Sequence, residues 1–595
     1  MNELLHQLRS LIIAKTDYTE LLKWARRVEK QGLVLEDAPS LKVAVLGSKN
    51  SQFFTQILKV SLMNQGIQPN IYEGEYDSIR YELLTQDSGL HRFKPDFLIL
   101  LPDSSDLKIW PQILDDELTV DTLVETHVQD QLALWNSILQ DHPCVILQSN
   151  YVLPLENALD SMEINVPYSK TVFLTKLNLA LMKAKPKQVH LIDENGLSNE
   201  IGKRAWFDPA NRVLNKAPYA YEWLPQCVSI YVRQIMALKG TYRKVLVLDL
   251  DNTLWGGVIG DDGLEGIQLD PNTAIGESFL AFQSAVLSLK EKGVMLAVCS
   301  KNDQSIAQTG FSHPNMTLKI SDIACFIANW NDKASNLKTI AETLNVKPDA
   351  LVFFDDNPAE RQIVKDFLSE VLVVEVPEDP SGYVRALYDA HAFDWPQITK
   401  EDLMRIKAVE GDSIRESLKA QFVDYDAYLA SLQMSAIMGK ITPAQLERFV
   451  QLTNKSNQFN LRTQRVNEAE ILDRMNDPES ACLAIDLSDR FSPYGIIACA
   501  ILKKQGQTAF IENWIMSCRV LNRGVEKLTL SLLAQTAKHW GCTTLIGENL
   551  RSPKNDLVAD HYLKMGFTQV DETKYALDLS IPILPPDTIT LKETL

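Results

Sequence analysis

The chain has 595 residues, of which 45% are hydrophobic and 23% are charged, as in ordinary globular proteins. At about 150 residues per domain this length predicts three or four domains, and the formal net charge of −18 argues against a surface that binds nucleic acid. Eight cysteines without a Cys-x-x-Cys pair exclude a disulfide framework and a zinc site, and no apolar run approaches the roughly 18 residues of a membrane span.

These features predict a cytoplasmic protein that has neither a membrane nor a nucleic acid as a partner. The amino terminus lacks the basic and then apolar stretch of a signal peptide. The segment 1–35 carries apolar side chains at helical spacing, at Leu4, Leu5, Leu8, Leu11 and Ile12. We therefore expect this segment to be helical and to pack its apolar side against the rest of the chain.

Three apolar stretches in the next part of the chain are typical of buried parallel strands, at 41–46, 97–101 and 145–148. Helical stretches separate them, which predicts a parallel α/β domain over residues 36–225. Ser48 follows the first strand, and the arrangement resembles the SGNH-hydrolase fold, in which such a serine works with a downstream Asp-x-x-His. Because no Asp-x-x-His occurs before residue 240, Ser48 has no evident base, and we expect a degenerate domain that binds or scaffolds.

The central part of the chain contains the stretch that carries the chemistry. Val245-Leu246-Val247-Leu248 is typical of a strand buried on both faces, and Asp249 and Asp251 follow where such a strand ends. Alternation sends these two side chains to the same side of the chain. Two carboxylates so close repel each other, and a Mg2+ ion held by carboxylates and substrate phosphate oxygens is the usual solution.

Two further strands and one helix place polar residues that suit the same site. The apolar stretch 294–299 runs to Ser300, and the stretch 351–354 runs to the pair Asp355 and Asp356. Between them Lys333 opens a helix, for which the preceding residue, Asp332, is a suitable N-cap. Because parallel strands release their functional residues at their carboxyl ends, these side chains are candidates for one site.

The order strand-Asp-x-Asp, strand-Ser, Lys and strand-Asp-Asp resembles the haloacid dehalogenase (HAD) superfamily. Three runs are similar to its FkbH-like branch, subfamily IIIC: Trp255-Gly256-Gly257-Val258, Cys299-Ser300-Lys301-Asn302 and Asp355-Asp356-Asn357-Pro358-Ala359-Glu360-Arg361. FkbH-like enzymes take a glyceryl unit from 1,3-bisphosphoglycerate, remove its phosphate and load the unit onto an acyl carrier protein in polyketide or related biosynthesis. The resemblance implies a phosphorylated three-carbon substrate and a carrier in trans, since this chain has no Asp-Ser-Leu pantetheinylation site.

The resemblance also implies a role for each polar residue of the central domain, which we place at residues 226–400. Asp249 is the expected nucleophile, and Asp251 is expected to protonate the departing oxygen and then to activate water. Ser300 is expected to hydrogen-bond a phosphoryl oxygen, and Lys333 to neutralise the growing negative charge. The expected Mg2+ ligands are Asp249, Asp251 through its main-chain carbonyl, Asp355 and, as an alternative or supporting ligand, Asp356.

The acyl group could reach the carrier thiol directly or through a thioester on the enzyme. Cys299 adjoins Ser300 and is the first candidate for such a thioester, with Cys518 as its rival. Strand alternation, however, points Cys299 opposite to Ser300, as for a small residue of the core. The expected substrate-binding residues are Asn252, Thr253, Trp255, Gly256, Gly257, Lys301, Asn302, Arg519 and Arg523.

A third domain is expected over residues 410–585. The run from Ser517 to Glu526 precedes a helical stretch, and together with residues 560–567 it resembles GNAT acyltransferases. Leu521 and Glu526 depart from the GNAT motif that cradles pyrophosphate, and a carboxylate there is unfavourable by charge and size. We therefore expect a GNAT-like shell that docks a phosphopantetheine arm or a carrier, rather than an acetyl-CoA enzyme.

Together these patterns predict a multi-domain α/β chain in which a HAD-like parallel sheet lies between an SGNH-like and a GNAT-like domain. Between the first two HAD motifs there is no room for a large cap, so the active site is expected to be open to a bulky substrate. The leading hypothesis is glyceryl loading of a carrier. The alternatives are a HAD phosphatase that acts on a free small-molecule phosphate, and a non-catalytic carrier-binding scaffold, which has no physical reason to keep two crowded acid pairs.

Overall fold

The computed structural model describes residues 2–35, 38–217, 219–344, 346–396, 424–455, 459–462, 468–517, 520–550 and 558–592, with the single residues 398, 415, 418, 422 and 466. The chain divides into two compact units, residues 1–242 with 394–396 and residues 243–393 with 397–595. In the described part, the first unit contains one sheet and the second unit contains two.

The first sheet is parallel throughout, with strand order β2-β1-β3-β4-β5. This is one of the two common orders of doubly wound α/β domains, and it confirms the parallel α/β fold predicted for this region. The strands are β1 (Ser40–Gly47), β2 (Gln68–Glu73), β3 (Phe97–Leu101), β4 (Val145–Ser149) and β5 (Val189–Ile192). The helices are α1 (Asn2–Arg9), α2 (Tyr18–Lys30), α3 (Gln52–Asn64), α4 (Ile79–Leu84), α5 (Gly89–Phe93), α6 (Glu117–Asp141), α7 (Lys170–Ala184), α8 (Glu194–Ile201), α9 (Lys203–Trp206), α10 (Pro209–Leu214) and α11 (Leu224–Leu238).

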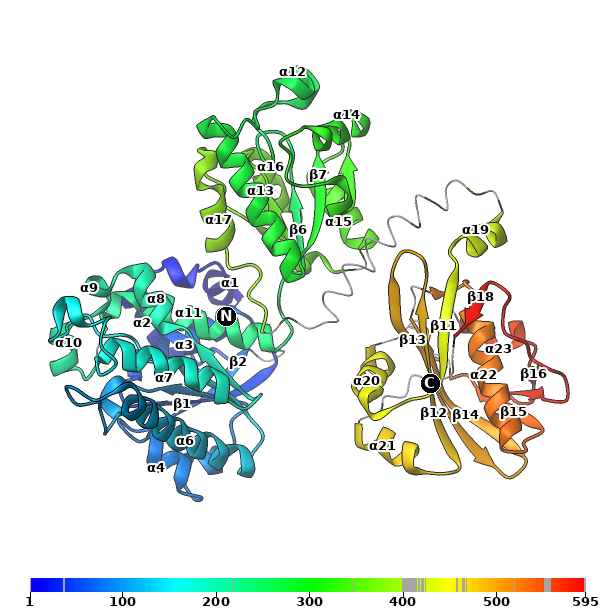
Figure 1. Cartoon of the computed structure of the whole chain (residues 1–595), viewed down its shortest axis with the longest axis horizontal. Coiled ribbons are helices and arrows are strands. Elements are labelled where there is room, and N and C mark those ends of the chain that lie inside the picture. Colours follow the sequence, from blue (N-terminus) through cyan, green and yellow to red (C-terminus); the bar gives the residue numbers. More distant parts are fainter. Residues whose placement is uncertain are drawn as a thin grey trace. The chain divides into compact units, whose positions relative to one another are not determined.

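Helices cover both faces of this sheet (Figure 1). Along β1, Val43 and Val45 belong to a core shared with α1, α2, α3 and α11. The alternating residues Ala44 and Leu46 belong to the opposite core, shared with α6 and α7. Because side chains of a strand alternate between faces, an unbroken apolar strand requires a cover on each side, and this sheet has both.

Helix α11 belongs to the first unit, whereas the boundary predicted at 225/226 placed it in the central domain. Val228 and Tyr231 are fully buried in the same core as β1 and α3, and the Tyr231 hydroxyl donates a 2.7 Å hydrogen bond to Glu194. The first unit therefore runs to Tyr242. The segment 1–35 contains the helices α1 and α2 and packs into this core through Leu8 and Leu21, as its apolar pattern predicted.

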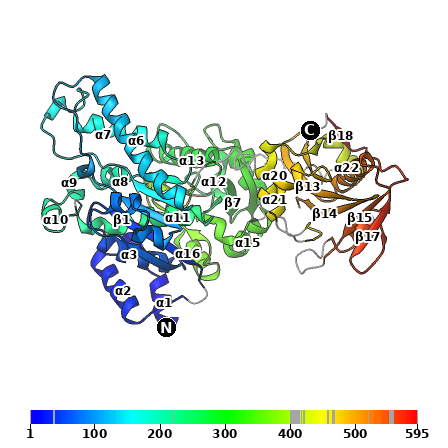
Figure 2. The same cartoon turned by 90° about the horizontal axis from the view of Figure 1, so that it is seen from below.

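The second sheet is also parallel, with strand order β10-β9-β6-β7-β8. Its strands are β6 (Val245–Leu248), β7 (Met295–Ser300), β8 (Ile323–Ala328), β9 (Leu351–Phe354) and β10 (Leu372–Val373). Its helices are α12 (Ile259–Gly266), α13 (Ala274–Lys292), α14 (Gln304–Thr309), α15 (Lys333–Thr343), α16 (Pro358–Phe367) and α17 (Tyr383–Asp389). Figure 2 shows α13 on one side of the sheet and α15 and α16 on the other, so the central strand β6 is completely buried.

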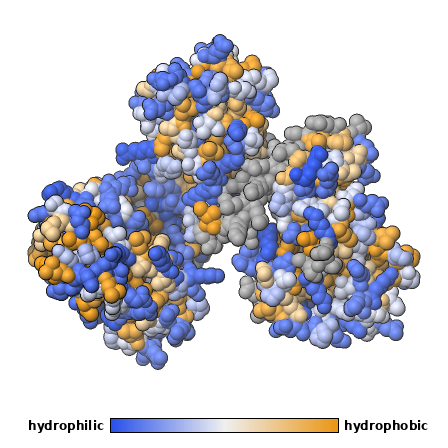
Figure 3. Space-filling view, viewed as in Figure 1, coloured by the Kyte–Doolittle hydropathy of each residue, from blue (hydrophilic) through white to orange (hydrophobic). Residues whose placement is uncertain are grey.

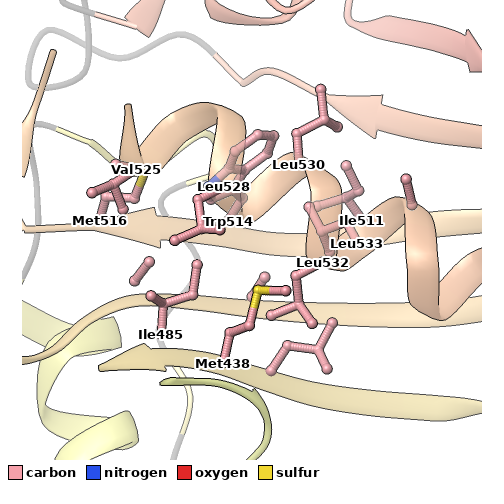
Figure 4. Packing of buried hydrophobic residues seen from close by; sticks show 14 of the residues in the cluster. Met438, Ile485, Ile511, Trp514, Met516, Val525, Leu528, Leu530, Leu532 and Leu533 are labelled. Atoms are coloured by element: carbon pink, nitrogen blue, oxygen red, sulfur yellow. The ribbon is translucent and has the colours of Figure 1, made fainter. Parts of the chain in front are cut away.

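The third sheet is mixed, with strand order β16-β17-β15-β14-β13-β12-β11-β18. Its strands are β11 (Met434–Lys440), β12 (Ser480–Ser488), β13 (Pro493–Gln505), β14 (Thr508–Met516), β15 (Thr544–Glu548), β16 (Thr568–Gln569), β17 (Lys574–Asp578) and β18 (Ile589–Leu591). The helices beside it are α19 (Tyr425–Ser431), α20 (Leu446–Lys455), α21 (Glu468–Asn476), α22 (Val525–His539) and α23 (His561–Lys564). The parallel pair β14 and β15 is joined through α22, whose Leu528 and Leu532 pack on Ile511 and Trp514 of the sheet (Figure 4). This is the α+β arrangement predicted for a GNAT-like domain.

Strands β14 and β15 pair only as far as Ile511 and Gly547, although β14 continues to Met516. Beyond that point the segment Phe459–Leu461 lies along β14. The Met516 N–H donates to the carbonyl of Phe459 at 3.2 Å, and the Leu550 N–H donates to the carbonyl of Leu461 at 2.8 Å. A short piece of the chain therefore takes the place of β15 where the two strands part.

Hydrophilic and hydrophobic residues are interspersed over the face of the molecule shown in Figure 3. Exposed large apolar residues such as Trp330 and Phe367 are common on protein surfaces and need no special explanation. In the part of the chain that the structure describes, no helix is both long enough and apolar enough to cross a membrane.

Candidate active site

The predicted acids meet at the carboxyl edge of the second sheet. In the ladder of this sheet Leu248 of β6 lies opposite Phe354 of β9, so the residues that follow them, Asp249 and Asp355, are neighbours. The main chain continues this pairing, because the Asp249 N–H donates to the carbonyl of Phe354 at 3.0 Å. Ser300 lies at the end of β7, on the other side of β6. The parallel order of the strands thus brings together residues more than 100 positions apart.

Asp249, Asp355 and Asp356 form a group of carboxylates whose ligand oxygens lie within 4.8 Å of one another. Asp355 is completely buried, and the Thr253 hydroxyl donates to a carboxylate oxygen of Asp356 at 3.1 Å. Carboxylate oxygens are the ligands that Mg2+ prefers. The donor set therefore fits a hard divalent cation. Asp251 was predicted to bind Mg2+ through its main-chain carbonyl, and its carboxylate lies outside this group.

Lys333 is buried against two of these acids. Its ammonium group lies 2.8 Å from Asp249 Oδ1 and 3.0 Å from Asp355 Oδ2, and it donates to the carbonyl of Cys299 at 2.7 Å. Asp332 caps the helix that Lys333 begins, as predicted, by accepting the N–H of Ser335. Burial alone would lower the pKa of Lys333, but Asp249 and Asp355 outweigh burial and raise this pKa above its ordinary value.

Burial and mutual repulsion raise the pKa values of two of these acids. Burial raises the pKa of Asp355 to about 7, and repulsion from Asp249 acts in the same direction. The pKa of Asp356 is also raised, again by burial first and by Asp249 second. One lysine does not compensate three neighbouring carboxylates. A bound cation would relieve the remaining repulsion, which is a second reason that this group fits Mg2+.

Asp251 is held apart from the metal group by three hydrogen-bond donors. Its Oδ1 accepts from Trp255 Nε1 at 2.9 Å and from the N–H of Ile259 at 3.0 Å, and its Oδ2 accepts from Asn302 Nδ2 at 2.7 Å. The same Asn302 nitrogen lies 3.3 Å from the hydroxyl of Ser300. Asn302 thus links the predicted acid–base residue to the predicted phosphate-binding serine.

Cys299 does not lie in this site, which corrects its prediction as the thioester residue. Its side chain is completely buried in the apolar core beneath α15, beside Ala334 and Leu337. Burial raises the pKa of its thiol to about 12, which disfavours the reactive thiolate. The physical reason is the alternation of β7, which points Cys299 and Ser300 to opposite faces. The rival Cys518 lies outside the described residues.

Most of the predicted substrate-binding residues of the first motif shape the loop after β6. Asn252 has a positive φ of 53°, and its side-chain oxygen accepts the N–H of Gly257 at 3.0 Å. Gly257 itself has φ 92°, a conformation that favours glycine. Thr253 binds Asp356, and Trp255 is fully buried with its indole N–H on Asp251, so neither residue presents its side chain to a substrate. Gly256 pairs through its main chain with Gln268.

The predicted cations have other partners in the structure. Lys301 forms a 2.6 Å ion pair with Glu360. Arg523 lies in the loop before α22 of the third sheet, where it donates a hydrogen bond to the hydroxyl of Tyr494. Arg519 lies outside the described residues. The first two contacts give these residues structural roles that the sequence alone did not indicate.

Arg361 was not predicted as a functional residue, although the motif that contains it was noted. Its guanidinium Nη1 donates to the carbonyls of Asp355 and Asp356, both at 2.7 Å, and the side chain is 8% exposed. These bonds fix the turn that presents both carboxylates. The sequence signal that could have identified Arg361 is its position. It is a cation in the first turns of a helix that directly follows two acids.

Among the described residues, the hydroxyl of Ser48 in the first unit is hydrogen-bonded to an acid and to main-chain groups. Its hydroxyl donates a hydrogen bond to Asp106 and accepts the N–H of Asp103 at 3.0 Å. Burial raises the pKa of Asp106.

In the third sheet, Glu526 accepts the N–H of Asn522 at 2.7 Å, so a main-chain donor of that loop is already used.

Comparisons with known proteins bear on the first two sheets. Residues 42–236 match the family model described as FkbH, N-terminal domain. The chain is similar to the N-terminal part of the protein BF1531 from Bacteroides fragilis, a solved structure that contains a phosphatase domain and is complexed with Mg. The identity is 32% and the TM-score 0.58, and the match covers 64% of this chain and 100% of that one. No curated protein matched the chain.

The chain is also weakly similar to solved structures of acetyltransferases. For the ribosomal-protein-S18-alanine N-acetyltransferase of Escherichia coli the identity is 15% and the TM-score 0.20, with 24% of this chain and 95% of that one covered. For the GNAT domain of S. lividans PAT the identity is 16% and the TM-score 0.20. That match covers 24% of this chain and 89% of the other chain. Likenesses this weak support no statement about activity.

Proposed function

Because the chain belongs to the FkbH-like family of the HAD superfamily, we propose that it takes a glyceryl unit from 1,3-bisphosphoglycerate, removes its phosphate and loads the unit onto an acyl carrier protein. The observation that carries the phosphatase chemistry is the group of Asp249, Asp355 and Asp356 with Lys333 buried against it. The relative from Bacteroides fragilis contains a phosphatase domain and binds Mg, which supports the same chemistry here. The carrier is a separate chain that bears a phosphopantetheine arm.

Removal of the phosphate uses two acids with divided roles. A carboxylate oxygen of Asp249 attacks phosphorus, and the bond between phosphorus and the glyceryl oxygen breaks. Asp251 gives a proton to that departing oxygen, and it later takes a proton from the water that hydrolyses the aspartyl-phosphate. The donors on Trp255 and Asn302 hold the Asp251 carboxyl group in place for both transfers.

The charged residues around phosphorus stabilise the negative charge of the transferring group. Lys333 is already fixed beside Asp249, so its charge needs no rearrangement during the reaction. Ser300 donates its hydroxyl to a phosphoryl oxygen. Asp249, Asp355 and Asp356 would hold Mg2+, which when bound supplies positive charge against the phosphoryl oxygens. Arg361 keeps the last two acids in position through their carbonyls.

Loading of the carrier is a direct transfer in this proposal. The thiolate of the carrier arm attacks the acyl carbon of the acyl phosphate, a carbon–sulfur bond forms, and the carbon–oxygen bond to phosphate breaks. A thioester on Cys299 is not part of the reaction, because that thiol lies in the core below the sheet. The acyl phosphate supplies the driving force, so the step needs no further reactant.

Intact-protein mass spectrometry of enzyme and carrier tests the proposal. The full chain is mixed with Mg2+, 1,3-bisphosphoglycerate and a phosphopantetheinylated carrier, and the wild type is compared with Asp249→Asn and Cys299→Ala. We expect a dephosphorylated glyceryl adduct on the carrier with wild type and with Cys299→Ala, and none with Asp249→Asn. Phosphate release without any adduct would refute the loading reaction and leave a HAD phosphatase for a free substrate. Binding of carrier without phosphate release would favour a scaffold.

A further inference from the structure

The loop after β6, residues 250–257, carries Asp251 on a tight turn. The carbonyl of Leu250 accepts the N–H of Leu254 at 2.7 Å, which closes the turn. Asn252 lies inside it with a positive φ of 53°, in the left-handed region that costs energy for a residue with a Cβ atom. A backbone conformation of this kind persists where its surroundings hold it. The contacts of Asn252 therefore help to decide where its neighbour Asp251 lies.

Tyr383 supplies such a contact from a distant part of the chain. Its hydroxyl donates a 3.0 Å hydrogen bond to the carbonyl of Asn252, which lies 131 positions earlier in the sequence. Tyr383 is the first residue of α17, and its side chain is buried. Burial raises the pKa of Tyr383, so the hydroxyl keeps its proton and remains a donor.

The ring of Tyr383 is fixed independently of its hydroxyl. It packs edge to face on three phenylalanines, with ring centroids 6.0 Å from Phe279, 5.6 Å from Phe282 and 5.5 Å from Phe354. Phe354 is the last residue of β9, so this cluster connects Tyr383 to the sheet that carries the acids. Replacement of Tyr383 by phenylalanine would keep the ring contacts and remove only the hydrogen bond.

A second buried side chain holds the same loop two residues further on. Gln283 of α13 is completely buried, and its Nε2 donates to the carbonyl of Leu254 at 2.7 Å. Its Oε1 accepts the N–H of Thr317 at 2.8 Å and that of Leu318 at 3.3 Å. The loop therefore has one anchor on α13 and one on α17, and loss of the Tyr383 hydroxyl should displace it locally without unfolding it.

The nucleophile does not depend on these anchors. Asp249 directly follows β6, and its N–H continues the ladder by donating to the carbonyl of Phe354 at 3.0 Å. Its carboxylate is paired with Lys333. Asp251, in contrast, belongs to the loop itself. A weakened anchor at Asn252 should thus displace the acid–base residue and leave the nucleophile in place.

We propose that Tyr383 is a positioning residue for Asp251: its hydroxyl holds Asn252 so that the Asp251 carboxyl group can give its proton to the departing oxygen. The inference rests on the proposed function, because it concerns the proton transfer assigned there to Asp251. An alkoxide is strongly basic and needs that proton as it leaves, whereas p-nitrophenolate is stable without it. A displaced Asp251 should therefore slow the release of an alkyl leaving group much more than that of p-nitrophenolate.

Phosphate release from two compounds tests the inference on the full chain in saturating Mg2+. The compounds are 3-phosphoglycerate, whose leaving group is an alkyl oxygen, and p-nitrophenyl phosphate. The wild type is compared with Tyr383→Phe and with Tyr388→Phe, which removes the hydroxyl of an exposed tyrosine on the same helix as a matched control. We expect Tyr383→Phe to lower kcat/KM about tenfold for 3-phosphoglycerate and less than about threefold for p-nitrophenyl phosphate. The control should stay within about twofold of wild type for both compounds.

Hydrogen exchange followed by mass spectrometry gives a readout that needs no turnover. A peptide that spans residues 249–257 should exchange about fivefold faster in Tyr383→Phe than in wild type, as expected for the loss of one neutral hydrogen bond. The same peptide should be unchanged in Tyr388→Phe.

Three results would overturn the inference. Tyr383→Phe lowers kcat/KM equally for both compounds, which would assign the residue to general stability, or it lowers neither, or the exchange of the loop peptide is unchanged. Failure of the proposed function looks different. The wild type would release phosphate from both compounds, and Tyr383→Phe would show the expected difference between them, but no glyceryl adduct would form on the carrier. A wild type that releases phosphate from neither compound would overturn both.

Discussion

Replacement of Lys333 by methionine is the sharpest test of the central group, because it removes one buried charge and keeps the shape of the side chain. Lys333 is 1% exposed and pairs with Asp249 and Asp355 at 2.8 and 3.0 Å. At an effective dielectric constant of about 20, each contact is worth about 6 kcal/mol before desolvation is subtracted. Breaking a buried pair by removing one partner costs about 3–5 kcal/mol. We expect Lys333→Met to destabilise the second sheet by about that amount.

Hydrogen exchange followed by mass spectrometry measures this loss locally, which suits a chain of several domains. Peptides from β6 and β9 should exchange at least about 100-fold faster in metal-free Lys333→Met than in wild type. Peptides from β1 serve as the internal control and should not change. The double variant Lys333→Met/Asp355→Asn removes one of the repelling carboxylates, so we expect it to recover at least half of the lost protection.

Equal exchange of β6 and β9 in wild type and Lys333→Met would refute the view that the lysine neutralises the two acids. An equal loss in the single and double variants would locate the effect in packing rather than in charge. Phosphate release is a separate readout. It should be abolished in Lys333→Met even under conditions where added Mg2+ restores the protection.

Further predictions concern neighbouring residues. Because the pKa of Asp355 is raised to about 7 in the folded protein, its contribution to stability is present at low pH and is lost as pH rises from about 4 to about 7. Asp355→Asn should flatten this part of the metal-free stability curve, measured by thermal unfolding, and an unchanged slope would contradict the assignment. Asn302→Ala, which removes one donor to Asp251, should lower kcat for phosphate release about 10-fold or more with little change in KM; a change confined to KM would contradict its positioning role. Cys299→Ser should leave the rate of carrier loading within about twofold of wild type, while it lowers the thermal stability by placing a hydroxyl in the core; loss of loading without loss of stability would restore Cys299 as a candidate.

The sequence was sufficient to predict the elements that carry the acids. An apolar run such as Val245-Leu246-Val247-Leu248 has few alternatives to a buried parallel strand, and a residue directly after it must lie at the carboxyl edge of the sheet. The same argument placed Asp355 and Asp356. Alternation also predicted, correctly, that Cys299 points away from Ser300, whereas the resemblance to a family had suggested Cys299 as a catalytic residue.

Contacts between distant segments could not be predicted from local sequence patterns. Nothing local indicates that Asn302 reaches Asp251, or that Trp255 turns its indole N–H inward, because both depend on how the loops after β6 and β7 fold over each other. The domain boundary shows the same limit. Only tertiary packing decides that the apolar side of α11 belongs to the first sheet.

The segment Phe459–Leu461 has a consequence for how the chain behaves at high concentration. Without it, the last residues of β14 would expose unpaired N–H and C=O groups where β15 has turned away. An open strand edge of this kind is a template for pairing with another molecule. The segment closes the edge with bonds to Met516 and, through Leu461, to Leu550. It therefore protects the third sheet against edge-to-edge self-association, and its loss would be seen first as poor solubility.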